Sequence, residues 1–260
     1  MINAGTHNKP LLLITNDDGC SSKGIAALIE VAREFGDVVV MAPQLNASAK
    51  GLSLTIDVPL RTYVVKAEPG LIVYACTGTP TDCVKLASEN FCPRKPDLVL
   101  SGINHGSNAS INTVYSATVG AALEAVIGGI PAIAFSLLNH SPKADFSACI
   151  PWMRTIIADV LKNGLPKGVA LNVNFPNLPV SEIKGIKVVR TAHALWTDSF
   201  ERHEHPVRQP YWWLTGTFVC DDNKEGTDQW AVENGYVSVV PVKPDITDHD
   251  SINLFKQRYE

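Results

Sequence analysis

The stretch LLLITNDDGCSSKGIAALIEVAREF, residues 11–35, decides the fold. It opens with the run LLLIT, which is ended by turn-forming residues, and such a run is typical of a strand covered on both faces. Residues 24–35 then carry a helical pattern of apolar positions. A buried strand followed directly by a helix is the opening unit of a doubly wound α/β sheet.

The same alternation continues along the chain. The pattern predicts further buried strands at 37–42, 96–100, 130–136 and 169–175, and helices at 80–91, 119–128 and 149–162. Thr79, Pro80 and Asp82 form a capping-box pattern, which fixes where the first of these helices begins. Residues 54–75 alternate and are rich in Val, Ile and Tyr, so we expect a β excursion there, such as a hairpin.

The composition changes after about residue 190. Residues 191–216 are aromatic and charged and show no alternation of strand and helix, which indicates an appended arm or an irregular subdomain. A last β segment is expected at 236–242. We therefore expect a Rossmann-like α/β catalytic domain over residues 1–190 and a C-terminal arm with a hairpin over residues 191–260.

Composition excludes several classes of protein. The chain has 260 residues, 45% of them hydrophobic, and a formal net charge of −4 with no basic run, so a dedicated nucleic-acid binder is not expected. Six cysteines form no C-x-x-C pair, which favours reduced thiols in a reducing compartment. The apolar run at 11–15 is too short for a signal peptide or a membrane span, so we expect a cytoplasmic protein.

Polar side chains follow three of the expected strands. Asp17 and Asp18 follow the first strand, Ser48 lies in the loop after the second, and Asn104 follows the strand at 96–100. Ligands of an open parallel sheet bind beyond the carboxyl ends of its strands. Two adjacent carboxylates with neutral oxygen donors suit a hard divalent cation such as Mg²⁺, Mn²⁺ or Ca²⁺. The alternative is that the two aspartates cap the next segment or form an Asx turn.

A second group of residues suits a phosphate. Asn108 lies four residues after Asn104, and turn formation is the alternative explanation for both asparagines. Ser116 and Thr118 directly precede the helix expected at 119–128, where free backbone N–H groups and the helix dipole favour a bound phosphate. Simple N-capping by Thr118 is the competing explanation.

Two motifs in the expected arm have less specific explanations. The run His203-Glu204-His205 has the spacing of metal ligands, but we interpret it as a solvated or interfacial segment. The cluster Tyr211-Trp212-Trp213 is most simply a hydrophobic contact within the arm or with a partner subunit.

Six motifs together resemble one known family. They are NDDG (16–19), AP..N.S (42–48), TGTP (77–80), SGIN.G.N (101–108), YS.TVGAA.E (115–124) and G.P..A.S (129–136). Their joint order is similar to that of the SurE family, the stationary-phase survival proteins that act as metal-dependent nucleoside monophosphate phosphatases. The motifs cover most of the first half of the chain.

The resemblance implies roles for individual residues. Asp17, Asp18, Ser48 and Asn104 would be the ligands of one divalent cation per subunit, Mg²⁺ or Mn²⁺, with Asp17 and Asp18 also the catalytic residues. The substrate phosphate would contact a second set: Asn108, Ser116 and Thr118.

The resemblance also implies a fold, substrates and an assembly. The fold would be a Rossmann-like three-layer sandwich with a mainly parallel sheet. Nucleoside 5′- and 3′-monophosphates would be the substrates, and short polyphosphate a further one in some members. The C-terminal part would be exchanged between subunits in homodimers and sometimes homotetramers, with no nucleic-acid polymer and no membrane as partner.

Two departures from the family pattern concern the substrate. Ala117 stands where the family often has Gly, and Gln44 and Leu45 stand where its second loop usually carries Asp and Arg. The extra methyl group at 117 would change phosphate affinity modestly, and the lost charges at 44 and 45 would change nucleotide preference rather than the chemistry.

Three rival classes fit less well. A signalling receiver also binds magnesium with an acidic pair after its first strand, but it needs an acceptor aspartate at the end of a central strand, where this chain has Ser101 and Ser136. A haloacid-dehalogenase-type phosphatase carries its two acids as D-x-D rather than adjacent. A dinucleotide oxidoreductase would have G-x-G-x-x-G after the first strand, and none follows it here.

Overall fold

The computed structural model describes residues 9–260, and the first eight residues of the expected catalytic domain lie outside the described part. The strands are β1 (Leu11–Thr15), β2 (Asp37–Pro43), β3 (Thr62–Glu68), β4 (Leu71–Cys76), β5 (Leu98–His105), β6 (Ala132–Leu137), β7 (Ala170–Phe175), β8 (Ile186–Val188), β9 (Leu195–His203), β10 (Tyr211–Val219) and β11 (Val237–Val242). The α-helices are α1 (Lys23–Ala32), α2 (Pro80–Asn90), α3 (Asn112–Tyr115), α4 (Ala117–Ile127), α5 (Ile150–Asn163), α6 (Asp228–Glu233) and α7 (Ile252–Tyr259).

Nine strands form one sheet in the order β3-β4-β2-β1-β5-β6-β7-β11-β8. From β4 to β7 every neighbouring pair is parallel, whereas β3 and β11 run antiparallel to β4 and β7. The chain moves from β1 outward to β2 and later returns to the other side of β1 with β5. The carboxyl ends of β1 and β5 therefore flank the topological switch point, where ligands bind in sheets of this kind.

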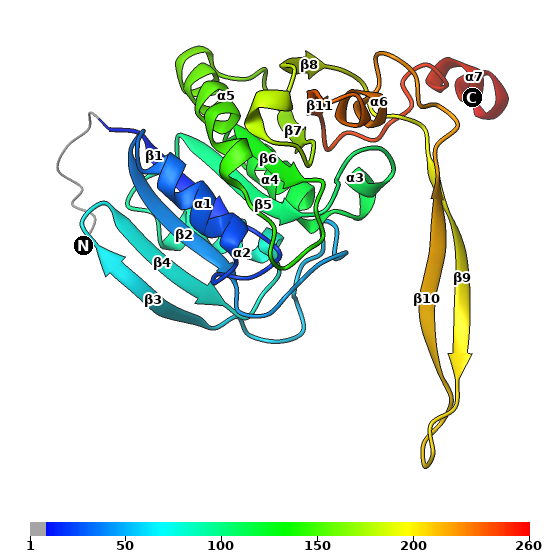
Figure 1. Cartoon of the computed structure of the whole chain (residues 1–260), viewed down its shortest axis with the longest axis horizontal. Helices are drawn as coiled ribbons and strands as arrows, with labels where there is room; N and C mark the ends of the chain where they lie inside the picture. The colour runs from blue at the N-terminus through cyan, green and yellow to red at the C-terminus, as the bar shows by residue number, and fades with distance from the viewer. Residues whose placement is uncertain (1–8) are drawn as a thin grey trace.

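Helices cover both faces of the sheet, so the expected three-layer α/β architecture is confirmed (Figure 1). Side chains of α1 and α5 pack with one face in one hydrophobic cluster, and side chains of α2 and α4 pack with the other face in a second cluster. The strands that cross the centre are buried on both sides; Leu12, Leu13 and Ile14 of β1 are each 0% exposed. Their nearly continuous apolar runs are the signal that identified them as central strands.

The predicted elements of the sheet are present, with two refinements. The strand expected at 96–100 continues to His105, because β5 pairs with β1 on one side and with β6 on the other through an irregularity between Ser101 and Asn104. The expected excursion at 54–75 contains the antiparallel pair β3–β4, and β4 also pairs in parallel with β2. This hairpin is therefore part of the main sheet rather than separate from it.

The C-terminal segment contains two different kinds of structure. Strands β9 and β10 form a regular antiparallel hairpin that extends away from the body (Figure 1), so the alternative of an irregular subdomain is wrong. Strand β11, near the expected position 236–242, pairs with β7 and β8 in the main sheet. Among residues 9–260, no helix has the length and apolar character needed to cross a membrane.

Candidate active site

The turn after β1 presents the two adjacent carboxylates. The Asn16 side-chain amide donates to the Gly19 carbonyl (3.0 Å) and to Ser22 Oγ (2.8 Å), which closes the turn. Gly19 has φ +101°, a conformation that a residue with a Cβ rarely adopts. Asp17 is 3% exposed and Asp18 is half-buried, so the turn buries one carboxylate and leaves the other partly accessible to solvent.

These carboxylates are electrostatically strained. Burial raises the pKa of Asp17 to about 6, the hydroxyl of Thr118 lowers it in part, and the neighbouring Asp18 raises it further. Burial also raises the pKa of Asp18, against the opposing effect of the His105 backbone N–H, which donates to Asp18 Oδ2 at 3.3 Å. Neither carboxylate forms a salt bridge with a residue of the described chain. Two close carboxylates without a salt-bridge partner are the chemistry that a divalent cation stabilises.

The loop after β2 lies against this turn. The Ala47 backbone N–H donates to the Asp17 carbonyl (2.8 Å), and Asn46 Oδ1 accepts from the Ser48 backbone N–H (2.8 Å). Ser48 itself is exposed. The residue before Ser48 is therefore hydrogen-bonded to the aspartate turn, and Ser48 follows it in the same loop.

Asn104 lies inside β5 and not in the loop that the sequence predicted. Its side chain is 9% exposed, and its amide nitrogen donates to the Gly106 carbonyl at 3.1 Å. That bond leaves the side-chain oxygen as the atom for a cation. The next residue, His105, donates to Asp18, so the end of β5 is hydrogen-bonded to the aspartate turn.

The start of α4 supplies a third contact with the aspartates. The Ser116 Oγ accepts from the Val119 backbone N–H (3.0 Å), so Ser116 is the N-cap and the alternative of capping by Thr118 is wrong. Thr118 is 0% exposed and donates to Asp17 Oδ1 at 2.7 Å. The helix begins two residues earlier than the pattern at 119–128 indicated, so Thr118 lies in its first turn, where it contacts the carboxylate.

Asn108 belongs to an adjoining buried network. Its side-chain amide donates to Ser136 Oγ (2.7 Å), its backbone N–H donates to Asn174 Oδ1 (2.9 Å), and its carbonyl accepts from the Asn172 side chain (2.9 Å). Ser136 is the β6 partner of Asn104 in the ladder, so the network and the aspartate turn meet at the end of β5.

Sequence reasoning missed the two asparagines of β7 and Asp228. Asn172 and Asn174 are 0% exposed, and they stand two apart within the apolar run VALNVNF. Buried amides need hydrogen-bond partners, so amides at this spacing in a buried strand are the signal that could have identified them. Asp228 is equally buried and accepts from the Ser110 backbone N–H at 2.8 Å.

The structure also shows the surroundings of the capping-box residues and of the motifs in the C-terminal arm. Both hydrogen bonds of the capping box between Thr79 and Asp82 are present at the start of α2, as predicted. His203 and Glu204 are exposed at the tip of the β9–β10 hairpin, and the rings of His203 and Tyr211 stack at 5.4 Å.

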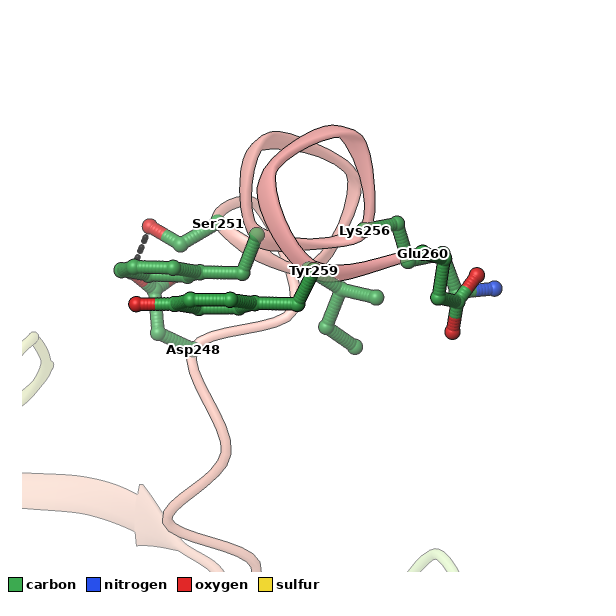
Figure 2. A pocket seen from close by; sticks show the side chains of 7 residues that line it. Asp248, Ser251, Lys256, Tyr259 and Glu260 are labelled. Carbon is green, nitrogen blue, oxygen red and sulfur yellow. Dashed lines mark hydrogen bonds between the residues drawn. The ribbon is translucent and has the colours of Figure 1, made fainter.

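A separate hollow of about 500 Å³ lies on α7, far along the chain from the crevice. Figure 2 shows that its lining comes from this one helix and the turn before it, where Ser251 donates to Asp248. The rings of Phe255 and Tyr259 stack in parallel there, 6.2 Å apart. No strand end contributes to this hollow, which distinguishes it from the crevice at the switch point.

Taken together, the fold and the crevice define a class of doubly wound α/β proteins with an acidic, oxygen-rich site at the switch point. Hydrogen bonds connect Asp17 to Thr118 and Asp18 to His105. Ser48 and Asn104 are the sequence neighbours of Ala47 and His105, which are hydrogen-bonded to the aspartate turn. Among residues 9–260 there is no cluster of three or more His, Cys, Asp or Glu that could hold a metal ion.

Comparison with known proteins identifies the family within this class. The family model for the survival protein SurE matches residues 12–198, and the chain belongs to the SurE family. It is 50% identical to a curated 5′-nucleotidase SurE of Flavobacterium psychrophilum over 94% of this chain and 96% of the relative. It is 52% identical to the 5′-nucleotidase SurE of Christiangramia forsetii over 94% and 95% of the two chains.

A solved structure agrees with the fold. The crystal structure of the SurE protein from Aquifex aeolicus superposes with a TM-score of 0.83 at 40% sequence identity, covering 96% of this chain and all of that one. The shared fold includes the mostly parallel sheet between two layers of helices.

Proposed function

We propose that this chain is a divalent-metal-dependent phosphatase that hydrolyses nucleoside 5′-monophosphates to a nucleoside and phosphate. Nucleoside 3′-monophosphates and short polyphosphate are further substrates for the same chemistry. The observation that carries the proposal is the pair of adjacent carboxylates at the switch point, buried Asp17 and half-buried Asp18, neither of which has a salt-bridge partner in the described chain. The activity named for the curated relatives supports it.

The cation would be Mg²⁺ or Mn²⁺, one per subunit, held by Asp17, Asp18, Ser48 and Asn104. All four offer oxygen atoms, which are the ligands that such hard cations prefer. A bound divalent cation supplies charge neutralisation at the phosphoryl oxygens and lowers the pKa of a water molecule. The half-buried Asp18 is the more accessible carboxylate, so we assign it the acceptance of the proton from the attacking water.

The remaining polar residues position the phosphate. Asn108 and Ser116 contact it in this proposal, and the N-terminus of α4 adds free backbone N–H groups and the positive end of a helix dipole. The hydroxyl of Thr118 has one proton and donates it to Asp17, so it orients that carboxylate and donates to the phosphate only when that bond is released. The orienting role is one that the sequence did not indicate.

We propose a cytoplasmic homodimer or homotetramer in which the C-terminal part is exchanged. Exposed aromatic side chains on the β9–β10 hairpin support this, since Trp212 is 57% and Trp213 is 62% exposed. Light scattering tests the assembly: the chain is expected to be dimeric or tetrameric, and the double change Trp212→Ser and Trp213→Ser is expected to weaken the larger species. A monomer at all concentrations contradicts it.

The activity is tested by phosphate release from AMP. We expect release with Mg²⁺ or Mn²⁺, its loss on chelation with EDTA, and its recovery when the cation is added back. Release that is insensitive to EDTA, or no release with any divalent cation, contradicts the proposal. The receiver alternative predicts stable labelling by acetyl phosphate without turnover, yet β5 and β2 end in His105 and Pro43 rather than in an acceptor aspartate.

A further inference from the structure

A cavity of about 230 Å³ adjoins the aspartate turn. It lies between the loop after β2 and the start of α2, and Gln44, Leu45, Ala47, Lys50, Thr77 and Gly78 are among the residues that line it. Ala47 connects it to the proposed catalytic site, since its backbone N–H donates to the Asp17 carbonyl at 2.8 Å. The loop that carries Ser48 therefore both lines this cavity and contacts the aspartate turn.

The lining has a distinctive chemistry. No carboxylate lines the cavity, and Lys50 is its only charged side chain. Leu45 is 79% exposed, so a large apolar side chain faces solvent at the rim. The backbone N–H of Gln44 donates to the Cys76 carbonyl at 2.7 Å, which fixes the main chain from which the exposed carboxamide projects.

These features fit a flat, uncharged heterocycle with a polar edge. An apolar side chain provides a surface for the face of the ring, and a carboxamide both donates and accepts hydrogen bonds at its edge. The volume is below the roughly 300–1,000 Å³ of sites for drug-sized ligands, so it suits one heterocycle and not a dinucleotide. A single lysine is too little positive charge to make the cavity a site for a second phosphate chain.

We propose that this cavity binds the base of the nucleotide, with Leu45 packing against the ring and Gln44 bonding to its edge. The inference rests on the proposed phosphatase activity, whose phosphate site it extends. Leu45 and Gln44 are then residues that determine specificity, and they act on the binding of the substrate rather than on the bond that is cleaved.

The test compares AMP with ribose 5-phosphate, which has the same sugar and phosphate but no base. The wild-type chain is expected to show a higher kcat/KM for AMP. Leu45→Ala is expected to lower kcat/KM for AMP about tenfold, mainly through KM, and to leave ribose 5-phosphate unchanged, because truncation removes the apolar side chain that covers one face of the base. Gln44→Ala is expected to act in the same direction.

A matched control is Ile246→Ala, since Ile246 is a 97% exposed apolar residue outside the cavity. Leu45 is also largely exposed, so neither Leu45→Ala nor Ile246→Ala is expected to disturb folding. Adenosine, which lacks the phosphate, is expected to inhibit the wild type competitively and to inhibit Leu45→Ala less.

Three results separate the possible failures. Equal kcat/KM for AMP and ribose 5-phosphate in the wild type, or an AMP preference that survives both substitutions, overturns the base site and leaves the phosphatase proposal intact. No phosphate release from either substrate with any divalent cation overturns the phosphatase proposal, and the base site with it.

Discussion

Two buried aspartates, Asp17 and Asp228, differ in the number of hydrogen-bond donors that contact their carboxylates. Asp228 is 0% exposed and accepts hydrogen bonds from three backbone N–H groups, those of Ser110, Ala192 and Gln229, each at 2.8 Å. Asp17 is 3% exposed, but its side chain accepts one hydroxyl hydrogen bond, from Thr118, and has a second carboxylate beside it.

The difference separates a structural carboxylate from a functional one. Asp228 connects the loop after β5 and the base of the hairpin to the start of α6. Burial raises the pKa of Asp228 as well, but three backbone N–H groups oppose that effect, whereas Asp17 has one hydroxyl donor. Asp17 is held in a position where its charge is costly until a cation arrives. Strain of this kind is stored at functional sites and is compensated elsewhere in the fold.

The change with the largest expected effect is Asp17→Asn. It keeps the shape of the side chain but removes one negative ligand, so hydrolysis of AMP is expected to fall at least about 100-fold. Without divalent cations, its free energy of unfolding at pH 7.5 is expected to equal or exceed that of the wild type, because a buried charge is removed. Asp221→Asn, at an exposed position, is the control for both measurements. Near-normal turnover would reject the assignment of Asp17.

A divalent cation is expected to stabilise the wild type and not the Asp17→Asn variant. A ligand at 100 times its dissociation constant raises the free energy of unfolding by about 2.7 kcal/mol, which thermal or urea unfolding with and without Mn²⁺ would detect. Equal stabilisation of both chains would place the cation elsewhere.

The pH dependence follows from the same carboxylate. The folded pKa of Asp17, about 6, is above its value in the unfolded chain, so in the absence of cation its contribution to stability is present at low pH and is lost as the pH rises through 6. Protons and cation compete for the group, so Mn²⁺ affinity is expected to weaken by about tenfold per pH unit below this value. Calorimetric titrations at pH 5 and pH 7.5 that give equal affinities would contradict this.

Asp228→Asn is expected to have the opposite profile from Asp17→Asn. One carboxylate oxygen becomes an NH₂ group that faces a backbone N–H, so the free energy of unfolding is expected to fall by about 2 kcal/mol in urea melts. Asp221→Asn again provides the exposed control. An unchanged unfolding midpoint would show that the three backbone donors find other partners.

The smallest expected effect is that of Thr118→Val. The substitution preserves shape and removes the hydroxyl that orients Asp17, so Mn²⁺ affinity is expected to fall by about tenfold, as for other residues that support a metal ligand. A change in phosphate affinity with unchanged cation affinity would assign the hydroxyl to the substrate instead.

Much of the fold could be predicted because its signals are local. The apolar runs around Leu13 and Val39 and the capping box at Thr79 act within a few residues, and they gave the central strands and the start of α2. The extension of β5 to Asn104 depends on pairing with two other strands, and no local signal carries that information.

The candidate site divides in the same way. Asp17 and Asp18 are visible because they directly follow a buried strand. The bond from Ser110 to Asp228 spans 118 residues, and the bond from Thr118 to Asp17 spans 101, so only the folded chain reveals them. A hairpin was expected in the C-terminal arm, but the bounds of β9 and β10 were not, because both strands are largely exposed and lack the alternation that identifies a half-buried strand.

Anomalous diffraction from a crystal of the chain grown with Mn²⁺ tests the central assignment most directly. We predict one manganese peak per subunit, in contact with the carboxylates of both Asp17 and Asp18 and with the side-chain oxygens of Ser48 and Asn104. A peak at any other place, or none at these carboxylates at saturating Mn²⁺, would contradict it.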